Sequence, residues 1–128
     1  MDDSIKVDIE GNLYFDGQKL THDKIIEFFK KLDLEKIDDK TYQLKWQNNN
    51  QTQRITVIPE DTVFVIKDVV KESNEIKLVI NDETMEKLDT SMLEFKGNIP
   101  YTIVKRGRIK ARFNRNAAFK LGEIILGT

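Results

Sequence analysis

The residues best suited to chemistry in this sequence are cations near its C-terminal end. From Lys105 to Lys120 there are seven lysines and arginines and no acidic residue. Arg108, Lys110 and Arg112 recur at every second position, a spacing that places all three side chains on one face of a β-strand. Such a row of cations can hold phosphates or carboxylates through charge-assisted hydrogen bonds. It is equally typical of the solvated side of an amphipathic strand, where cations oppose edge-to-edge aggregation.

Aromatic and acidic residues elsewhere could complete an anion site. Tyr14 and Tyr101 combine an apolar ring with a polar hydroxyl, which suits the wall of a cleft, although their alternation with polar neighbours equally suits a core. Glu60 and Asp61 are adjacent carboxylates that could serve acid–base chemistry or a turn before the following strand. The sequence therefore predicts these ligand-binding residues: Arg106, Arg108, Lys110, Arg112, Arg115, Tyr14, Asp61 and Tyr101.

No catalytic apparatus is recognisable in the sequence. The chain has no cysteine and a single histidine, so a zinc site would have to be built from carboxylates around it. That histidine, His22, falls at the start of an expected helix, where the helix dipole disfavours its charged form, and no serine nucleophile with a local signature accompanies it. The scattered glycines form neither a dinucleotide-binding nor a Walker pattern. We expect no metal and no cofactor, and a binding protein rather than an enzyme.

The charge balance and the apolar runs limit the class of partner. Outside residues 105–120 the 128-residue chain has 14 cations against 22 acids. The resulting pI of about 5.9, with no stacking aromatics among the cations, argues against nucleic acid. The apolar runs are far shorter than the roughly 20 residues that span a bilayer, and the acidic start Met1–Asp3 lacks the features of a secretory signal. We expect a cytoplasmic protein that binds an anionic small molecule or an acidic protein surface, in an oligomeric state that the sequence leaves open.

The elements that must position these residues begin with a hairpin and a helix. Apolar alternation on both sides of a Gly-Asn turn predicts a β-hairpin over 5–15. Helical spacing of apolar residues over 21–32, with Thr21 as N-cap, predicts an amphipathic helix. Alternation over 42–46 and a short apolar segment at 55–57 predict two further strands.

The C-terminal part has the pattern of an antiparallel sheet closed by a helix. Residues 62–113 contain about six strand-like segments, although 81–89 fits a helical turn as well as an extended piece. The last two segments form a hairpin around Arg106-Gly107. Asn114 is expected to cap a final helix. The apolar face of that helix is expected to hold Ala118, Leu121, Gly122 and Ile125.

This order of elements predicts an α+β fold in two parts. Residues 1–58 would form an N-terminal hairpin-plus-helix subdomain, and residues 59–128 a β-rich subdomain with a terminal helix. The strand, turn and capped helix that follow Gly11 are echoed at the C-terminal end. The echo suggests an internal duplication, at supersecondary level only.

Several segments, in order and spacing, resemble the bacterial domain-of-unknown-function family 1285. They are Ile9–Gly17, Tyr42–Leu44, Val57–Phe64 and Pro100–Arg112. The resemblance implies a two-part α+β architecture with repeated units and a C-terminal half superficially similar to pleckstrin-homology-like folds. It also implies a part in signalling through a cleft between the halves, and no established reaction.

Three functional hypotheses follow from these observations. The leading one is a non-enzymatic binding or regulatory module whose basic hairpin, Arg106 to Arg115, engages an anionic ligand or acidic partner near the junction of the halves. The second is a small enzyme that uses Asp61 or Glu60 on a substrate held by the arginines. The third is nucleic-acid binding, against which the acidic pI argues.

Overall fold

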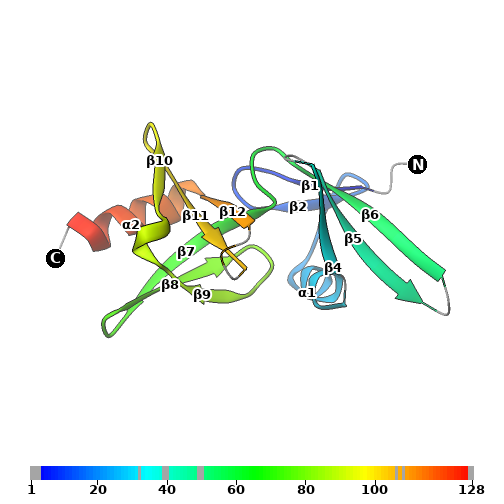
Figure 1. Ribbon diagram of the computed structural model, residues 1–128, viewed down its shortest axis with the longest axis horizontal. Coiled ribbons are helices and arrows are strands. Elements are labelled where there is room, and N and C mark those ends of the chain that lie inside the picture. Colours follow the sequence, from blue (N-terminus) through cyan, green and yellow to red (C-terminus); the bar gives the residue numbers. More distant parts are fainter. Residues whose placement is uncertain are drawn as a thin grey trace. The chain divides into compact units, whose positions relative to one another are not determined.

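Short segments of alternating apolar residues, interrupted by two helical stretches, give this chain an α+β fold, as the computed structural model shows (Figure 1). The predicted fold class is confirmed. Two units are distinguished, Met1–Asp8 with Asn12–Val63 and Ile9–Gly11 with Phe64–Thr128. The expected division into domains at 58/59 stays a prediction. The structure describes residues 4–31, 33–38, 41–48, 51–105, 107 and 109–126.

The first unit contains a six-stranded sheet of order β3-β2-β1-β6-β5-β4. All neighbouring strands are antiparallel except β1 and β6, which are parallel. The elements are β1 (Ser4–Val7), β2 (Leu13–Phe15), β3 (Gln18–Lys19), α1 (His22–Lys31), β4 (Asp33–Asp38), β5 (Thr41–Asn48) and β6 (Gln51–Pro59).

The core of the first unit is built from one face of this sheet. Ile5 of β1 lies opposite Val57 of β6, and both side chains are fully buried. Ile25 of α1 is buried as well. The Lys24 amide donates to Thr21 Oγ1 at 3.4 Å, which confirms the predicted N-cap. The predicted hairpin and helix are therefore confirmed, whereas strand β4 was not predicted.

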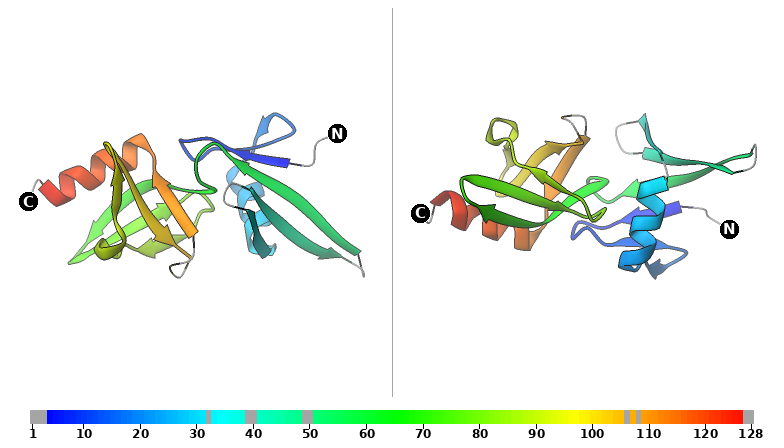
Figure 2. Two further views of the ribbon diagram at one scale, coloured as in Figure 1. Left: turned by 45° about the horizontal axis from the view of Figure 1, so that its top comes forward. Right: turned by 90° about the horizontal axis from the view of Figure 1, so that it is seen from below.

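The second unit contains a sheet of order β10-β11-β12-β7-β8-β9, which curls into a half-barrel (Figure 2). Its six strands confirm the predicted number, and the ambiguous stretch 81–89 contains a strand, β9. The elements are β7 (Phe64–Glu72), β8 (Glu75–Ile80), β9 (Met85–Lys87), η1 (Thr90–Met92), β10 (Glu94–Lys96), β11 (Ile99–Val104), β12 (Ile109–Phe113) and α2 (Arg115–Leu126). The likeness to pleckstrin-homology folds stays a prediction.

Helix α2 packs against β7 and β12 and is capped as predicted. The Ala117 amide donates to Asn114 Oδ1 at 2.8 Å. The expected apolar face of the helix was partly wrong, because Ile125 is 47% exposed, and the buried residues are Ala117 and Leu121. These two lie at i and i+4 and define a face rotated from the expected one.

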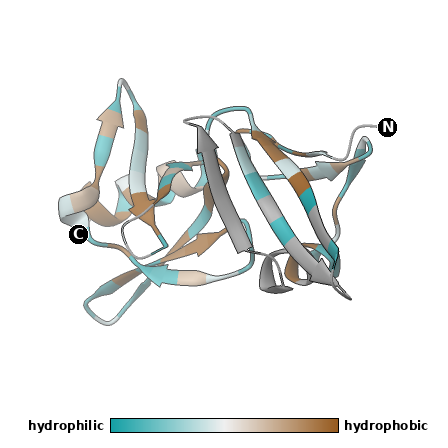
Figure 3. Ribbon diagram, turned by 45° about the vertical axis from the view of Figure 1, so that its right-hand side comes forward, coloured by the Kyte–Doolittle hydropathy of each residue, from teal (hydrophilic) through white to brown (hydrophobic). Residues whose placement is uncertain are grey.

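The two sheets have the same topology. In each unit two three-stranded antiparallel meanders meet through a parallel pair, β1 with β6 and β7 with β12. Along several strands, hydrophobic positions alternate with hydrophilic ones (Figure 3), as expected for sheets with one buried face. The start of β7, Phe64–Ile66, is instead apolar and buried throughout. The helices differ in their place along the chain. Helix α1 comes between the two meanders of the first unit, whereas α2 follows the second meander of its unit. None of the helices in the described ranges is long and apolar enough to cross a bilayer.

Candidate functional site

The predicted cationic row is partly visible on β12. Ala111 and Phe113 are buried, while Lys110 and Arg112, which alternate with them along the strand, are only half-buried. The alternation expected from the sequence therefore holds within the strand, with the two cations on the face opposite to Ala111 and Phe113. The predicted site residues Arg106 and Arg108 lie outside the described residues.

Tyr101 of β11 lies next to these two cations and also contacts a third, Lys96. It lies opposite Arg112 in the β11–β12 ladder, which places both side chains on the same face of the sheet. The Lys110 ammonium lies 4.8 Å from the centroid of the Tyr101 ring. The Lys96 ammonium, from β10, lies 5.5 Å from the same centroid. Both distances allow cation–π attraction. We call Lys96, Tyr101, Lys110 and Arg112 the basic face.

The sequence analysis missed Lys96, although a local signal for it exists. Gly97-Asn98 is a turn dipeptide, and the hairpin that it closes pairs Lys96 with Ile99 and Glu94 with Tyr101. Residues 94 and 96 therefore reach the same face as Tyr101. Extending the predicted hairpin by this one turn would have added one cation and one acid to the site.

The acid on this face is Glu94, which forms an ion pair with Lys110 at 3.5 Å. The side chains are 66% and 41% exposed, so the pair is solvated. Exposed pairs of this kind contribute about 0–1 kcal/mol and are screened by salt. An incoming carboxylate or phosphate can therefore compete with Glu94 for Lys110.

The segment Ile9–Gly11 supports the strands beside the basic face. A Cβ on Gly11 would lie 3.1 Å from Val65 Cβ and 3.2 Å from Lys67 Cγ, so this backbone lies directly against β7. Asn114 Nδ2 donates to the Glu10 carbonyl at 3.1 Å. Because β7 pairs with β12, this segment contributes to holding the strand that carries Lys110 and Arg112.

The cationic run is free of acids in sequence, but not in space. Lys105 Nζ lies 2.6 Å from the buried Asp82 carboxylate and 2.9 Å from Thr84 Oγ1. The same ammonium lies 5.0 Å from the Phe64 ring centroid. Lys120 Nζ donates to Asp68 Oδ1 at 2.7 Å. These two lysines therefore act within the second unit as structural partners of its own carboxylates.

The remaining predicted site residues, Tyr14, Asp61 and Arg115, are not part of the basic face. Tyr14 and Asp61 belong to the first unit, and Asp61 is exposed in the segment between β6 and β7. Arg115 is exposed at the first position of α2. The expected site at the junction of the two halves stays a prediction.

Tyr14 instead takes part in a local cluster of the first unit. Its hydroxyl donates to Asp8 Oδ2 at 3.2 Å, and the backbone N–H of Asn12 donates to Asp8 Oδ1 at 2.8 Å. Burial, followed by the nearby Asp8 carboxylate, raises the pKa of the Tyr14 hydroxyl above its ordinary value of 10.0. The hydroxyl therefore remains a hydrogen-bond donor at neutral pH.

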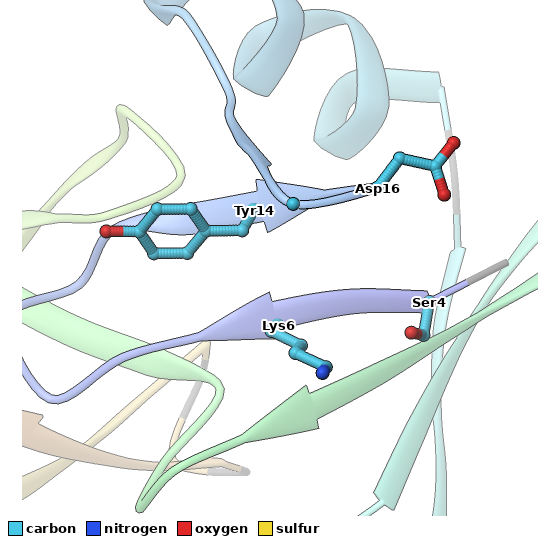
Figure 4. A pocket seen from close by; sticks show the side chains of 5 residues that line it. Ser4, Lys6, Tyr14 and Asp16 are labelled. Carbon is cyan, nitrogen blue, oxygen red and sulfur yellow. The ribbon is translucent and has the colours of Figure 1, made fainter. Parts of the chain in front are cut away.

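Tyr14 also borders a small pocket of about 160 Å³ (Figure 4). Ser4 and Lys6 come from β1, Tyr14 from β2, and Asp16 with Gly17 from the turn after β2. Pockets that enclose a drug-sized ligand measure about 300–1,000 Å³. This pocket is too small for such a ligand, and its Lys6 and Asp16 carry opposite charges.

A larger groove of about 530 Å³ runs between α2 and β7. Its lining is apolar at Val69, Val70 and Ile124 and charged at Lys71, Lys120 and Glu123. Lys120 already donates to Asp68 at 2.7 Å. No three potential metal ligands of the His, Cys, Asp and Glu types come together among the residues that the structure describes.

The α+β fold of this chain is similar to that of a protein of known structure. A crystal structure of a DUF1285 family protein from Shewanella baltica OS155 matches it with a TM-score of 0.66 and 16% sequence identity, over 91% of this chain and 88% of that one. No family model and no curated protein matches the sequence. The resemblance to domain-of-unknown-function family 1285 is thus confirmed at the level of the fold. A match at this identity says nothing about activity.

Proposed function

We propose that the protein is a non-enzymatic binding module that recognises a carboxylate or phosphate group of an anionic ligand or acidic partner through the basic face. The observation that carries this proposal is the placement of two ammonium groups, those of Lys96 and Lys110, 5.5 and 4.8 Å from one Tyr101 ring centroid, with Arg112 on the same face.

The physical basis is charge that is already in place before a ligand arrives. Tyr101 is only 5% exposed, so its ring is a fixed support for the two lysines. Arg112 is half-buried on a central strand of the sheet, which restricts its guanidinium. Fixed donors lose less conformational entropy on binding than free surface side chains do. An arginine beside lysines can also bind a carboxylate or phosphate in a bidentate manner.

A binding role is better supported than a catalytic one by the residues around this face. The basic face offers hydrogen-bond donors but no serine, cysteine or histidine side chain, and the acid beside it, Glu94, is 66% exposed and paired with Lys110. The alternative, an enzyme that uses Asp61 or Glu60 on a substrate held by the arginines, stays a prediction. A regulatory or signalling role is part of the same proposal and rests on the family resemblance alone. The expected cytoplasmic location stays a prediction.

The test is an NMR titration with two probes, hexaglutamate peptide for a carboxylate ligand and inorganic pyrophosphate for a phosphate ligand. We expect amide shifts concentrated in residues 94–112 with at least one probe, decreasing as salt is added. Each of Lys96→Ala, Lys110→Ala and Arg112→Ala should weaken binding about fivefold, the equivalent of about 1 kcal/mol for a partly exposed charge pair.

The matched control is Lys87→Ala, because Lys87 is a 66% exposed cation on β9 of the same sheet. Its loss should leave the affinity unchanged. If neither probe shifts residues 94–112, or if Lys87→Ala weakens binding as much as Arg112→Ala does, the proposal is wrong.

A further inference from the structure

Helix α2 has an exposed apolar stripe that the core does not use. Phe119 is 70% exposed and Leu126 is 86% exposed. They are seven residues apart, or almost two full helical turns, so their side chains lie on one face about 10 Å apart along the axis. Gly122 lies between them and has no side chain, so another surface can approach the helix closely at this point. Figures 1 and 2 show α2 along the sheet of the second unit, with one side of the helix turned away from the strands.

Charged residues are arranged symmetrically about Phe119 on the same face. Arg115 lies four residues before Phe119 and Glu123 four residues after it, and both side chains are exposed. Residues four apart on a helix are neighbours on its surface. Arg115 and Glu123 are eight residues apart, too far to pair with each other. Within the described part of the chain, neither Arg115 nor Glu123 forms an ion pair.

We infer that α2 is a homodimer interface and that its occupant is α2 of a second copy of this chain, packed antiparallel about a twofold axis at Phe119. In this arrangement the two Phe119 rings are in contact. A residue four positions before the axis meets one four positions after it, so Arg115 of each copy faces the partner's Glu123.

This charge complementarity selects a second copy over an unrelated partner. A twofold interface uses the same patch twice and must therefore be complementary to itself. A cation and an acid at equal distances on either side of a large apolar residue satisfy that requirement on an antiparallel helix pair. The interface involves one helix face and belongs to the small, reversible class, so we expect a Kd on the order of 10–100 μM.

Sedimentation velocity of the full chain, from about 5 to about 500 μM to bracket that affinity, tests the inference. The wild type should shift from monomer to dimer across this range. Phe119→Ser should abolish dimers. Arg115→Glu and Glu123→Arg should each weaken dimerisation at least about tenfold, because each puts like charges together at two symmetric contacts.

Mixing the two charge variants is the decisive experiment. One variant then has Glu at both 115 and 123 and the other has Arg at both, so every contact in the mixed dimer joins opposite charges. The equimolar mixture should dimerise at least as well as the wild type. Lys87→Glu, a charge reversal at an exposed site on β9, should behave as the wild type does.

Three results would overturn the inference. They are a wild type that remains monomeric at the highest concentration, a dimer that persists in Phe119→Ser, and a mixture of the charge variants that stays as monomeric as its components. Since every substituted side chain is exposed, the circular dichroism spectrum of each variant should equal that of the wild type.

Discussion

Gly11 has the most restrictive surroundings among the glycines of the described chain. Its φ of +93° is one that L side chains rarely adopt, and a Cβ there would lie 3.1 Å from Val65 Cβ and 3.2 Å from Val65 Cγ1. We predict that Gly11→Ala lowers the free energy of unfolding by about 2 kcal/mol or more, because backbone strain and overpacking add. Urea unfolding measures the loss.

A substitution at Gly97 separates backbone strain from overpacking. Gly97 also has positive φ, +61°, but no atom lies within 4 Å of an added Cβ. Gly97→Ala should therefore cost only the backbone contribution, about 1 kcal/mol. Equal losses for the two variants would show that Gly11 is not in tight contact with β7.

At the scale of elements, the ion pair between Asp68 and Lys120 ties α2 to β7. The hydrogen bond from Lys120 is the main cause that holds the pKa of Asp68 below its ordinary value of 3.8. A carboxyl group with a lowered folded pKa stabilises the fold above its unfolded pKa, and this stabilisation is lost as pH falls through the folded value.

We therefore predict that Asp68→Asn is less stable than the wild type at pH 7 and that the difference shrinks as pH falls below about 4. Denaturant unfolding at pH 7 and at a pH below about 4 measures this difference in stability. The Asp68 side chain is 37% exposed, so the effect at pH 7 should be modest and should weaken further in salt. Glu72→Gln, which alters a 59% exposed partner of Lys77, is the matched control. A difference that stays constant with pH would contradict the prediction.

Elements defined by local signals could be predicted from the sequence. Thr21 and Asn114 cap their helices as expected, because capping involves residues within one turn. The alternation over 109–113 correctly gave the two faces of β12. By contrast β4 was missed, because its residues 33–38 are mostly charged and lack the apolar alternation that predicts a strand.

The candidate site was less predictable, because its composition depends on pairing between strands. Lys96 and Glu94 join Tyr101 only through the β10–β11 ladder. Lys105 meets Asp82 across 23 positions of sequence, a contact that no local spacing reveals. The acid-free run therefore overstated the free positive charge of this region.

For the whole molecule, the shared topology of the two sheets has a consequence for stability. In each unit the first and last strands form the central parallel pair, β1 with β6 and β7 with β12. The sheet is therefore complete only when the full length of the unit has folded. Contacts of such long sequence separation make folding slow and cooperative. The second unit extends this dependence further, since it also includes Ile9–Gly11 from the start of the chain.

We predict that a fragment of residues 59–128 is less stable than the same region in the full chain. Without Ile9–Gly11, Val65 loses the backbone packed against it, and Asn114 Nδ2 loses its acceptor, the Glu10 carbonyl. A lost partner for a buried polar group costs about 1–3 kcal/mol.

Hydrogen exchange should show faster exchange at β7 and at the start of α2 in the fragment. Gly11→Ala in the full chain should reproduce the effect at β7 with less change at α2, because Asn114 binds Glu10 and not Gly11. Identical protection in fragment and full chain would mean that residues 9–11 contribute nothing to the second unit.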